Sequence, residues 1–334
     1  MRSVIIAGFL LATFAVWVMV ESSSNAKPVV TATYIPSTDN RPITPIPVDI
    51  KLNPLMVELG SILFHDKRLS KDNTVSCSSC HNLNQAGQDG LAVAIGVKGL
   101  KGSVNSPTVF NSGFAFRQFW DGRSPTLEDQ VGGPIHNPVE MASNWQEVIG
   151  KLSKDPQIVA KFVEIWEEGI SQENIQNAIA EFERSLTTPN SPFDRYLKGD
   201  YSALTADEIK GWHLFRDLGC ISCHQGVGIG NNMYANLGVM GDYFADRGRP
   251  IVNSDLGRFN VTGRDKDRHV FKVPGLRNVA LTAPYFHDGS IDSLDEVVNT
   301  MARYQLGIKL NQQQRDYLVA FLKSLTGQFN ENGS

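Results

Sequence analysis

One pentapeptide occurs twice in this 334-residue chain, and it limits the possible folds more than any other feature. Residues 77–81 read CSSCH and residues 220–224 read CISCH, and together they hold all four cysteines. C-x-x-C-H is typical of c-type haem attachment, in which both thiols bond to the haem vinyl groups and the histidine reaches the iron. The sequence therefore predicts two covalent haems, bound by Cys77, Cys80, Cys220 and Cys223, with His81 and His224 as iron ligands.

Other chemistry also uses such cysteine spacing. Disulfides and a thioredoxin-like redox pair are possible, and the strongest alternative is one zinc ion held by all four thiolates. A zinc site leaves the histidine after each second cysteine unexplained. It also requires two pairs that are far apart in the chain to meet. Haem attachment remains the favoured interpretation.

The composition is that of an ordinary soluble globular protein. Hydrophobic residues make up 41% of the chain, charged residues 20%, and the net charge is −4. The absence of a basic block in the sequence argues against nucleic-acid binding. The length suggests two domains.

The N-terminus predicts export. Residues 4–20 are uncharged and almost wholly apolar and follow Arg2, as in a signal peptide or an N-terminal membrane anchor. Residues 24–26 (SNA) offer a cleavage site before Lys27, so residues 1–26 are either removed or retained as an anchor. In both cases the folded part lies outside the cytoplasm, and a periplasmic location agrees with haem attachment after export. Residues 27–50 are rich in Pro, Thr and Ser and predict an extended linker or a surface arm.

The remainder predicts a mainly α fold. Apolar residues recur at helical spacing after several residues that can cap a helix N-terminus: Asn53, Asn144, Thr205, Ser293 and Asn311. Residues 234–273 are rich in glycine and predict loops with one short hairpin.

The two halves also resemble each other outside the pentapeptides. Residues 60–66 (GSILFHD) match residues 211–217 (GWHLFRD), and residues 119–122 (FWDG) match residues 286–289 (FHDG). This pattern indicates a duplicated cytochrome c-like domain with one haem in each copy. A break at residues 188–192 places the domains at 51–190 and 191–334.

The residue opposite each histidine decides whether a haem transfers electrons or binds a ligand. In the second half Met301 is a candidate, and a methionine there raises the haem potential. Met301 is also compatible with a core position, and Met141, Met233 and Met240 are alternative ligands.

The first half offers no obvious second ligand, although His136 and Met141 are near enough in sequence to be considered. Glu140 lies between them in an apolar stretch, where a carboxyl has a raised pKa and can transfer protons. Most acidic residues are solvated surface groups instead. Trp120 is either a core residue or an electron relay, and only a position between the haems would favour the second role.

From Pro54 to Gly327 the chain resembles the bacterial di-haem cytochrome c peroxidases. The motifs that carry the resemblance are residues 77–83, 105–111, 118–123, 139–141, 219–224 and 276–287. The resemblance implies two cytochrome c folds with an interface between them. It also implies hydrogen peroxide as substrate, a small cytochrome c or a cupredoxin as electron donor, and a homodimer.

The resemblance also assigns roles to residues. The His81 haem would be the low-potential peroxidatic one, and the His224 haem, with Met301 opposite, the high-potential electron entry point. Glu140 would be the catalytic acid/base, with Gln130 and Pro134 lining its pocket, and Trp120 would lie between the haems. A structural calcium ion would bind the Asn105 side chain and the backbone oxygens of Thr282 and Pro284.

One position departs from the family pattern. Many members carry a distal histidine in a loop after the first motif, and Val97 stands there in this chain. Valine cannot bind iron, which predicts a first haem that is open without reductive activation. The missing histidine also resembles the methylamine-utilisation di-haem enzyme, which oxidises a partner protein and has tyrosine opposite its second haem. Met301 favours a peroxidase, but the nearby Tyr304 keeps that alternative open, as does a purely electron-transferring cytochrome.

Overall fold

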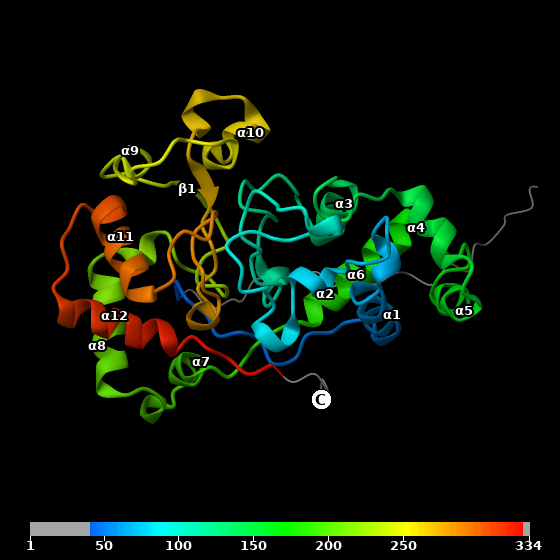
Figure 1. Cartoon of the computed structure of the whole chain (residues 1–334). Coiled ribbons are helices and arrows are strands. Elements are labelled where there is room, and N and C mark those ends of the chain that lie inside the picture. The colour runs from blue at the N-terminus through cyan, green and yellow to red at the C-terminus, as the bar shows by residue number, and fades with distance from the viewer. Residues whose placement is uncertain (1–40, 330–334) are drawn as a thin grey trace, which may run out of the picture.

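The computed structural model describes residues 41–329 as two lobes that lie side by side (Figure 1). The predicted export segment, 1–26, and the first part of the arm, 27–40, lie outside the described residues. Within the described range no helix is both long and apolar enough to span a membrane.

The predicted mainly α class agrees with the element order. The first lobe contains helices α1 (Pro54–Phe64), α2 (Cys77–Cys80), α3 (Leu127–His136), α4 (Trp145–Leu152), α5 (Pro156–Ile165) and α6 (Gln172–Ser185). The second contains α7 (Pro192–Leu197), α8 (Ala206–Asp217), α9 (Tyr243–Asp246), α10 (Phe259–Thr262), α11 (Leu294–Leu306) and α12 (Gln312–Lys323). A two-stranded antiparallel sheet pairs β1 (Tyr234–Asn236) with β2 (Val270–Lys272). Two of the short 3₁₀ helices matter for the sites, η3 (Val97–Gly99) and η6 (Cys220–Ser222).

The predicted capping residues begin the helices that the sequence assigned to them. The Asn53 side chain accepts hydrogen bonds from the first turn of α1, and Asn144 does the same for α4. Thr205, Ser293 and Asn311 begin α8, α11 and α12. These side chains satisfy backbone N–H groups that have no partner inside the helix, which fixes where each helix starts.

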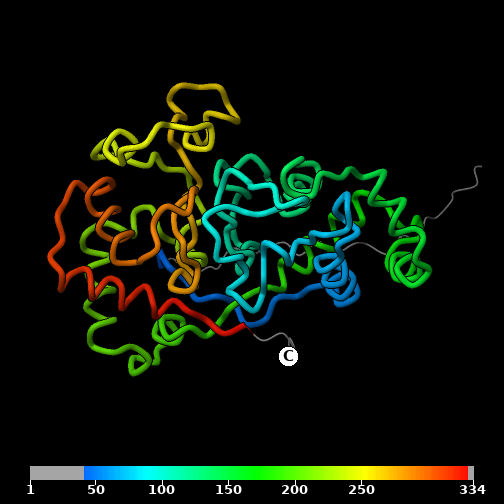
Figure 2. The backbone as a smooth tube through the Cα atoms, viewed as in Figure 1, coloured from blue at the N-terminus to red at the C-terminus, as the bar shows by residue number. Residues whose placement is uncertain are grey.

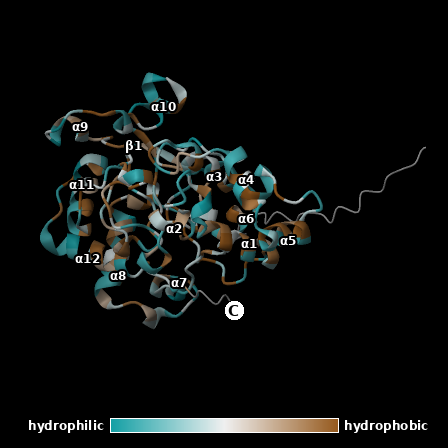
Figure 3. Ribbon diagram, turned by 45° about the vertical axis from the view of Figure 1, so that its right-hand side comes forward, coloured by the Kyte–Doolittle hydropathy of each residue, from teal (hydrophilic) through white to brown (hydrophobic). Residues whose placement is uncertain are grey.

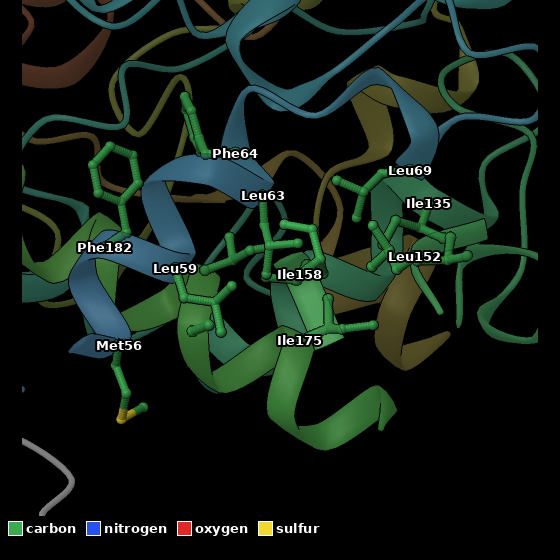
Figure 4. Packing of buried hydrophobic residues seen from close by; sticks show 14 of the residues in the cluster. Met56, Leu59, Leu63, Phe64, Leu69, Ile135, Leu152, Ile158, Ile175 and Phe182 are labelled. Carbon is green, nitrogen blue, oxygen red and sulfur yellow. The ribbon is translucent and has the colours of Figure 1, made fainter. Parts of the chain in front are cut away.

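The first lobe is built on α1 packed against α6. Gly60 allows the close approach, because a Cβ atom there would lie 1.9 Å from the Ala178 carbonyl oxygen. In Figure 4 the side chains of Leu59 and Leu63 point toward Ile158 and Ile175. Leu63 is fully buried, and burying such a side chain stabilises the fold by about 1.5–3 kcal/mol. Figure 3 shows hydrophobic residues on α1, α5 and α6 in the region where these helices pack together.

The second lobe repeats this packing with α8 and α12. A Cβ atom on Gly211 would lie 1.9 Å from the Tyr317 carbonyl oxygen, which matches the contact of Gly60. Phe215 packs on Phe321 with ring centroids 5.1 Å apart, as Phe64 packs on Phe182 at 5.2 Å in the first lobe. The duplication read from residues 60–66 and 211–217 is therefore a repeated helix pair.

The two repeats meet at Thr188. Its hydroxyl accepts one hydrogen bond from the Asn111 side chain at 2.8 Å and another from the Asn278 side chain at 2.9 Å. Both asparagines have left-handed backbones, with φ of 62° and 60°. A Cβ atom on Gly327 would lie 1.8 Å from the Thr188 carbonyl oxygen. Equivalent turns of the two lobes thus lock together around one threonine.

Both ends of the described chain cross to the opposite lobe, as the tube in Figure 2 shows. Residues 41–50 contain no helix or strand, in line with the extended arm, but Ile43 and Ile46 are fully buried rather than on the surface. Ile43 belongs to the core of the second lobe. Phe329 reaches the first lobe and packs on Phe110 with ring centroids 4.5 Å apart. This exchange joins the lobes at each end.

Two elements differ from the sequence interpretation. The sequence did not predict α3, because Gly132, Gly133 and Pro134 lie in its second half and weaken the helical pattern. The expected hairpin in residues 234–273 exists only as paired strands, with short helices inserted between them.

Candidate functional sites

A cavity of about 540 Å³ lies between the lobes, mostly within the second. Cys220, Cys223 and His224, which are carried by η6 and the turn after it, line one part of it. Met301 of α11 lines the same cavity. The remaining walls are largely apolar and include Phe215 and Leu322. Free thiols, a histidine and an apolar enclosure are the groups that a covalent haem needs.

The histidines of both pentapeptides are in the form that binds metal. Burial lowers the pKa of His224 to about 4, and burial also lowers the pKa of His81. Both rings are therefore neutral at pH 7, and a neutral imidazole nitrogen is a common metal ligand. His81 Nδ1 lies 3.4 Å from the Gly87 carbonyl oxygen, which orients its ring.

The four cysteines carry free thiols. Burial raises the pKa of Cys77 to about 12 and that of Cys80 and Cys220 to about 11, so these thiols are neutral. The pentapeptides lie in different lobes, and within residues 41–329 the cysteines form no common metal-binding cluster. This arrangement contradicts the single four-thiolate zinc site and fits two separate attachment sites.

Of the four methionines considered as ligands in the second site, Met301 is the one that lines the cavity with His224. Met141 is buried in the core of the first lobe, and Met240 is 61% exposed. Met233 is absent from the residues that line the cavity. Tyr304 does not line it either, and its hydroxyl donates a hydrogen bond to Asp246 at 2.9 Å. The geometry thus favours the Met301 sulfur atom over the Tyr304 hydroxyl as a ligand in the second site.

Val97 and Glu140 meet in the first lobe. The Val97 N–H donates to the Glu140 carbonyl oxygen at 2.8 Å, and Val97 is buried. Gly96 makes this approach possible, because a Cβ atom there would lie 2.2 Å from the Val139 carbonyl oxygen. The Glu140 carboxylate is also close enough to the Cys80 thiol to raise its pKa. The position of the missing histidine and the predicted acid/base therefore adjoin the same pentapeptide.

The Glu140 carboxyl is largely buried, which raises its pKa. The Arg123 guanidinium and a hydrogen bond from Asn137 Nδ2, at 2.7 Å, act in the opposite direction. Arg123 itself lies over the Phe119 ring, 3.4 Å from its centroid. In the sequence, Arg123 stood out only as the last residue of the motif at 118–123. The role of Asn137 was not predicted, although its position three residues before Glu140 was a usable signal.

Gln130 and Pro134 both lie on α3, the helix that leads to Glu140. The Phe119 ring packs closely against Gly133 of the same helix, where a Cβ atom would lie 2.6 Å from Phe119 Cζ. The other proposed ligand, His136, is exposed at the end of α3, and its Nδ1 lies 2.7 Å from the Gly132 carbonyl oxygen. His136 is therefore tied to its own helix.

Trp120 lies where the lobes meet. Its Nε1 donates to the Asn105 carbonyl oxygen at 3.0 Å, and its own carbonyl accepts from the Lys272 N–H at 2.8 Å. The indole lines the cavity and packs, together with Met301 and Phe286, against an aromatic cluster of the second lobe. Trp120 thus belongs to the first half of the sequence but packs against a cluster of the second lobe.

The three predicted calcium ligands come from both lobes. Asn105, Thr282 and Pro284 line one cavity although they come from different lobes. The Asn105 amide nitrogen donates to the Leu91 carbonyl at 2.8 Å, and its backbone N–H donates to the His287 carbonyl at 2.8 Å. Its side-chain oxygen is an available hard ligand of the kind that calcium prefers.

Two further features were not found from the sequence. Lys272 lines the cavity, where burial lowers its pKa to about 8, and its ammonium donates to Asn231 Oδ1 at 2.9 Å. Asp255, His287 and Asp288 form a compact cluster. The guanidinium of Arg247 pairs with both carboxylates, so this cluster is an internal ion-pair network.

The sites can be compared with known proteins. A family model described as di-haem cytochrome c peroxidase matches residues 54–202. The cytochrome c peroxidase Ccp of Escherichia coli is 51% identical over 294 residues, which cover 87% of this chain and 62% of the relative. The cytochrome c551 peroxidase of Nitrosomonas europaea is 44% identical over 289 residues, which cover 86% of this chain and 85% of the relative.

A solved structure has the same fold. It is the crystal structure of a MauG-like protein associated with microbial copper homeostasis, with a TM-score of 0.76 and 31% identity. The match covers 86% of this chain and 94% of that one.

Proposed function

We propose that this chain, which belongs to the di-haem cytochrome c peroxidase family, reduces hydrogen peroxide to water: H2O2 + 2 e⁻ + 2 H⁺ → 2 H2O. The electrons come one at a time from a small cytochrome c or a cupredoxin. Peroxidase names among relatives that match most of the chain support the reaction class.

The observation that carries the proposal is the difference between the residues at the two pentapeptides. At the first, Val97 and the largely buried Glu140 adjoin Cys80. At the second, Met301 lines the cavity that contains His224. At the first pentapeptide, Val97 cannot bind iron and a carboxyl that can transfer protons lies nearby, which suits peroxide chemistry. At the second, histidine and methionine as the two iron ligands suit electron transfer.

Glu140 handles the protons. Its carboxylate accepts a proton from one peroxide oxygen and returns it to the other, so that water leaves. Burial brings its pKa closer to neutral, which suits a group that must both accept and donate. The Arg123 guanidinium and the hydrogen bond from Asn137 favour the carboxylate form, which makes the first transfer. Gln130 and Pro134 of α3 line the pocket around the Glu140 carboxyl.

The two haems, held by the cysteines and ligated by His81 and His224, supply the redox chemistry when bound. Met301 raises the potential of the second site, which makes it the electron entry point. Trp120, which packs against the same cluster as Met301 and donates a hydrogen bond to Asn105, lies on the route between the sites. A calcium ion on Asn105, Thr282 and Pro284 would hold that route in place.

Val97 leaves the first site open in the oxidised protein. The Val97 side chain is buried and its backbone is fixed to Glu140, and His136 and Met141 are held elsewhere. We expect a high-spin first haem and a low-spin second haem in the oxidised absorption spectrum. Two low-spin haems would contradict the open site.

Glu140→Gln tests the assignment. The amide keeps the size of the side chain but cannot transfer the proton, so peroxide turnover is expected to fall about 10²–10⁴-fold. Reduction of both haems by the donor is expected to stay unchanged. Glu164→Gln, an exposed carboxylate of α5, is the matched control. Unchanged turnover in Glu140→Gln would show that Glu140 is not the acid/base.

A second candidate is an oxidase that acts on a partner protein, and the structural likeness to a MauG-like protein supports it. The hydrogen bond from Tyr304 to Asp246 and its absence from the cavity wall argue for the peroxidase. A purely electron-transferring cytochrome is the third. Peroxide consumption that requires a reduced donor separates the first from the others. We also propose a periplasmic location and a homodimer, which fractionation and light scattering test.

A further inference from the structure

Glu183 of α6 has an equivalent residue in the second lobe, because the helix pair is repeated there. Ala178 and Phe182 of α6 contact Gly60, and Tyr317 and Phe321 of α12 contact Gly211 in the same way. The offset between these equivalent residues is 139 in both cases, since 317 − 178 = 321 − 182 = 139. The same offset pairs Glu183 with Leu322.

Leu322 shows what this position faces. It is buried and lines the second haem cavity together with Cys220 and His224. Glu183 is 5% exposed, and its charge raises the pKa of Cys77, the counterpart of Cys220. A carboxyl therefore stands against the first haem site at the position where the second site has a hydrocarbon side chain.

The surroundings leave this carboxyl without a direct partner. No hydrogen bond within residues 41–329 stabilises its charge, and burial raises its pKa to about 8. Of the charged groups on the neighbouring elements, Arg184 of its own helix lowers the pKa and Glu128 of α3 raises it. Arg184 is engaged by Glu128 and Glu181. From α1, His65 faces the Phe182 ring at 6.4 Å, and from α2 the nearby group is Cys77.

We propose that Glu183 is a potential-setting residue of the first haem site, whose carboxyl lowers the midpoint potential of that site when it loses its proton. The inference rests on the two haem sites of the proposed function. A negative charge close to a haem stabilises the oxidised form, which is the more positive one, and therefore lowers the potential. At a buried position such as that of Glu183 this effect is larger than at the surface, and Leu322 cannot produce it in the second site.

The experiment measures both midpoint potentials of the holoprotein by spectroelectrochemical titration from pH 6 to pH 10. In the wild type, the first potential is expected to fall across the range in which Glu183 ionises. In Glu183→Gln and Glu183→Leu this fall should be lost. The first potential of either variant should then exceed that of the wild type at pH 10, with a smaller difference at pH 6. The second potential should be the same in all three proteins.

Glu181→Gln is the matched control, because Glu181 is equally buried on α6 but is bound to the Asn53 N–H and Arg184. It should retain the wild-type pH dependence of the first potential. If Glu183→Gln keeps that dependence, or if both potentials shift equally, the proposal is wrong. If Glu183→Leu fails to incorporate haem, Glu183→Gln decides. Peroxide turnover of the wild type is measured separately, so a failed peroxidase proposal does not affect this result.

Discussion

The two lobes share one packed helix pair, and equivalent positions of that pair carry different side chains. Gly60 and Gly211 make the same helix contact, and Asn111 and Asn278 bind the same hydroxyl of Thr188. The first site nevertheless has Glu183 where the second has Leu322. Gly60 and Gly211 keep the helix pair in both copies, because a larger residue would meet backbone atoms. The position that we propose to face a haem holds glutamate in one copy and leucine in the other, and the helix pair is the same in both.

The difference extends to the residues that we propose to lie opposite each histidine. Val97 lies in the short 3₁₀ helix η3 and Glu140 in a turn, both near the first pentapeptide, while Met301 lies on the regular helix α11. The loop that carries Val97 can therefore differ from its counterpart while the helices stay the same. Duplicated domains of this kind separate stability, which resides in the helix pairs, from chemistry, which resides in the loops and in single side chains.

The largest effect is expected from adding a methyl group between the packed helices. Gly60→Ala places a Cβ atom against the Ala178 carbonyl, and Gly211→Ala places one against the Tyr317 carbonyl. Because backbone cannot move aside as a side chain can, each is expected to cost about 3 kcal/mol of unfolding free energy, at the upper end of overpacking costs. Denaturant unfolding followed through each haem band should show a loss centred on the mutated lobe. Equal loss in both lobes would show that the effect of the added methyl group is not confined to its own helix pair.

Removing the shared hydroxyl should weaken both lobes together. Thr188→Val leaves the buried amides of Asn111 and Asn278 without their acceptor, at a cost of about 1–3 kcal/mol for an unsatisfied group. Thr188→Ser keeps the hydroxyl and is the control. Thermal unfolding monitored at both haems should move to lower temperature in the valine variant. A valine variant as stable as the serine variant would show that the Thr188 hydroxyl does not stabilise the contact between the lobes.

Replacing the proposed sulfur ligand should slow electron entry. Met301→Leu keeps the apolar volume in the cavity but removes the thioether, so the potential of the second site should fall. Donor-dependent turnover is expected to drop on the order of tenfold, about 1.4 kcal/mol in the barrier. The spectrum of the first haem should not change. Met240→Leu, at an exposed position, serves as the control. Retention of the potential in Met301→Leu would exclude sulfur ligation.

The smallest effect concerns the pH profile of the first site. Glu140 must be ionised to accept a proton, so turnover should decline toward acid pH, with a midpoint above the ordinary glutamate range because burial raises its pKa. Arg123→Gln removes a positive charge that lowers this pKa. The acid limb of the profile should therefore move to higher pH by less than one unit, and one unit corresponds to about 1.4 kcal/mol. Arg216→Gln in the other lobe should leave the profile unchanged. A limb that moves toward acid would reverse the proposed sign.

Much of the fold was predictable because local signals determine it. Asn53, Thr205 and Asn311 cap helices through contacts within one turn, so the sequence alone located their start. Helix α3 was missed for the opposite reason. Its two glycines and its proline disfavour a helix locally, and the carbonyls of Pro134 and Ile135 are instead bound by Met141 and Ser143 of the following turn.

The sites were predictable only in part. The pentapeptides identify the attachment residues, because both thiols and the histidine lie within five positions. The positions of Trp120 and Asn105 depend on contacts between lobes, which no local pattern contains. Glu183 was not singled out, since only its equivalence to Leu322 and its place beside Cys77 distinguish it from other helical glutamates.

The sequence by itself determined the chemistry that this chain can hold: two attachment motifs, a duplicated helical unit and a valine where a ligand histidine is common. Only the tertiary structure decided which methionine shares a cavity with His224 and which carboxyls stand beside the first site. The physical reason is the separation along the sequence over which each interaction acts. Caps and attachment motifs act over a few residues, whereas burial and electrostatic coupling depend on atoms brought together from distant parts of the chain.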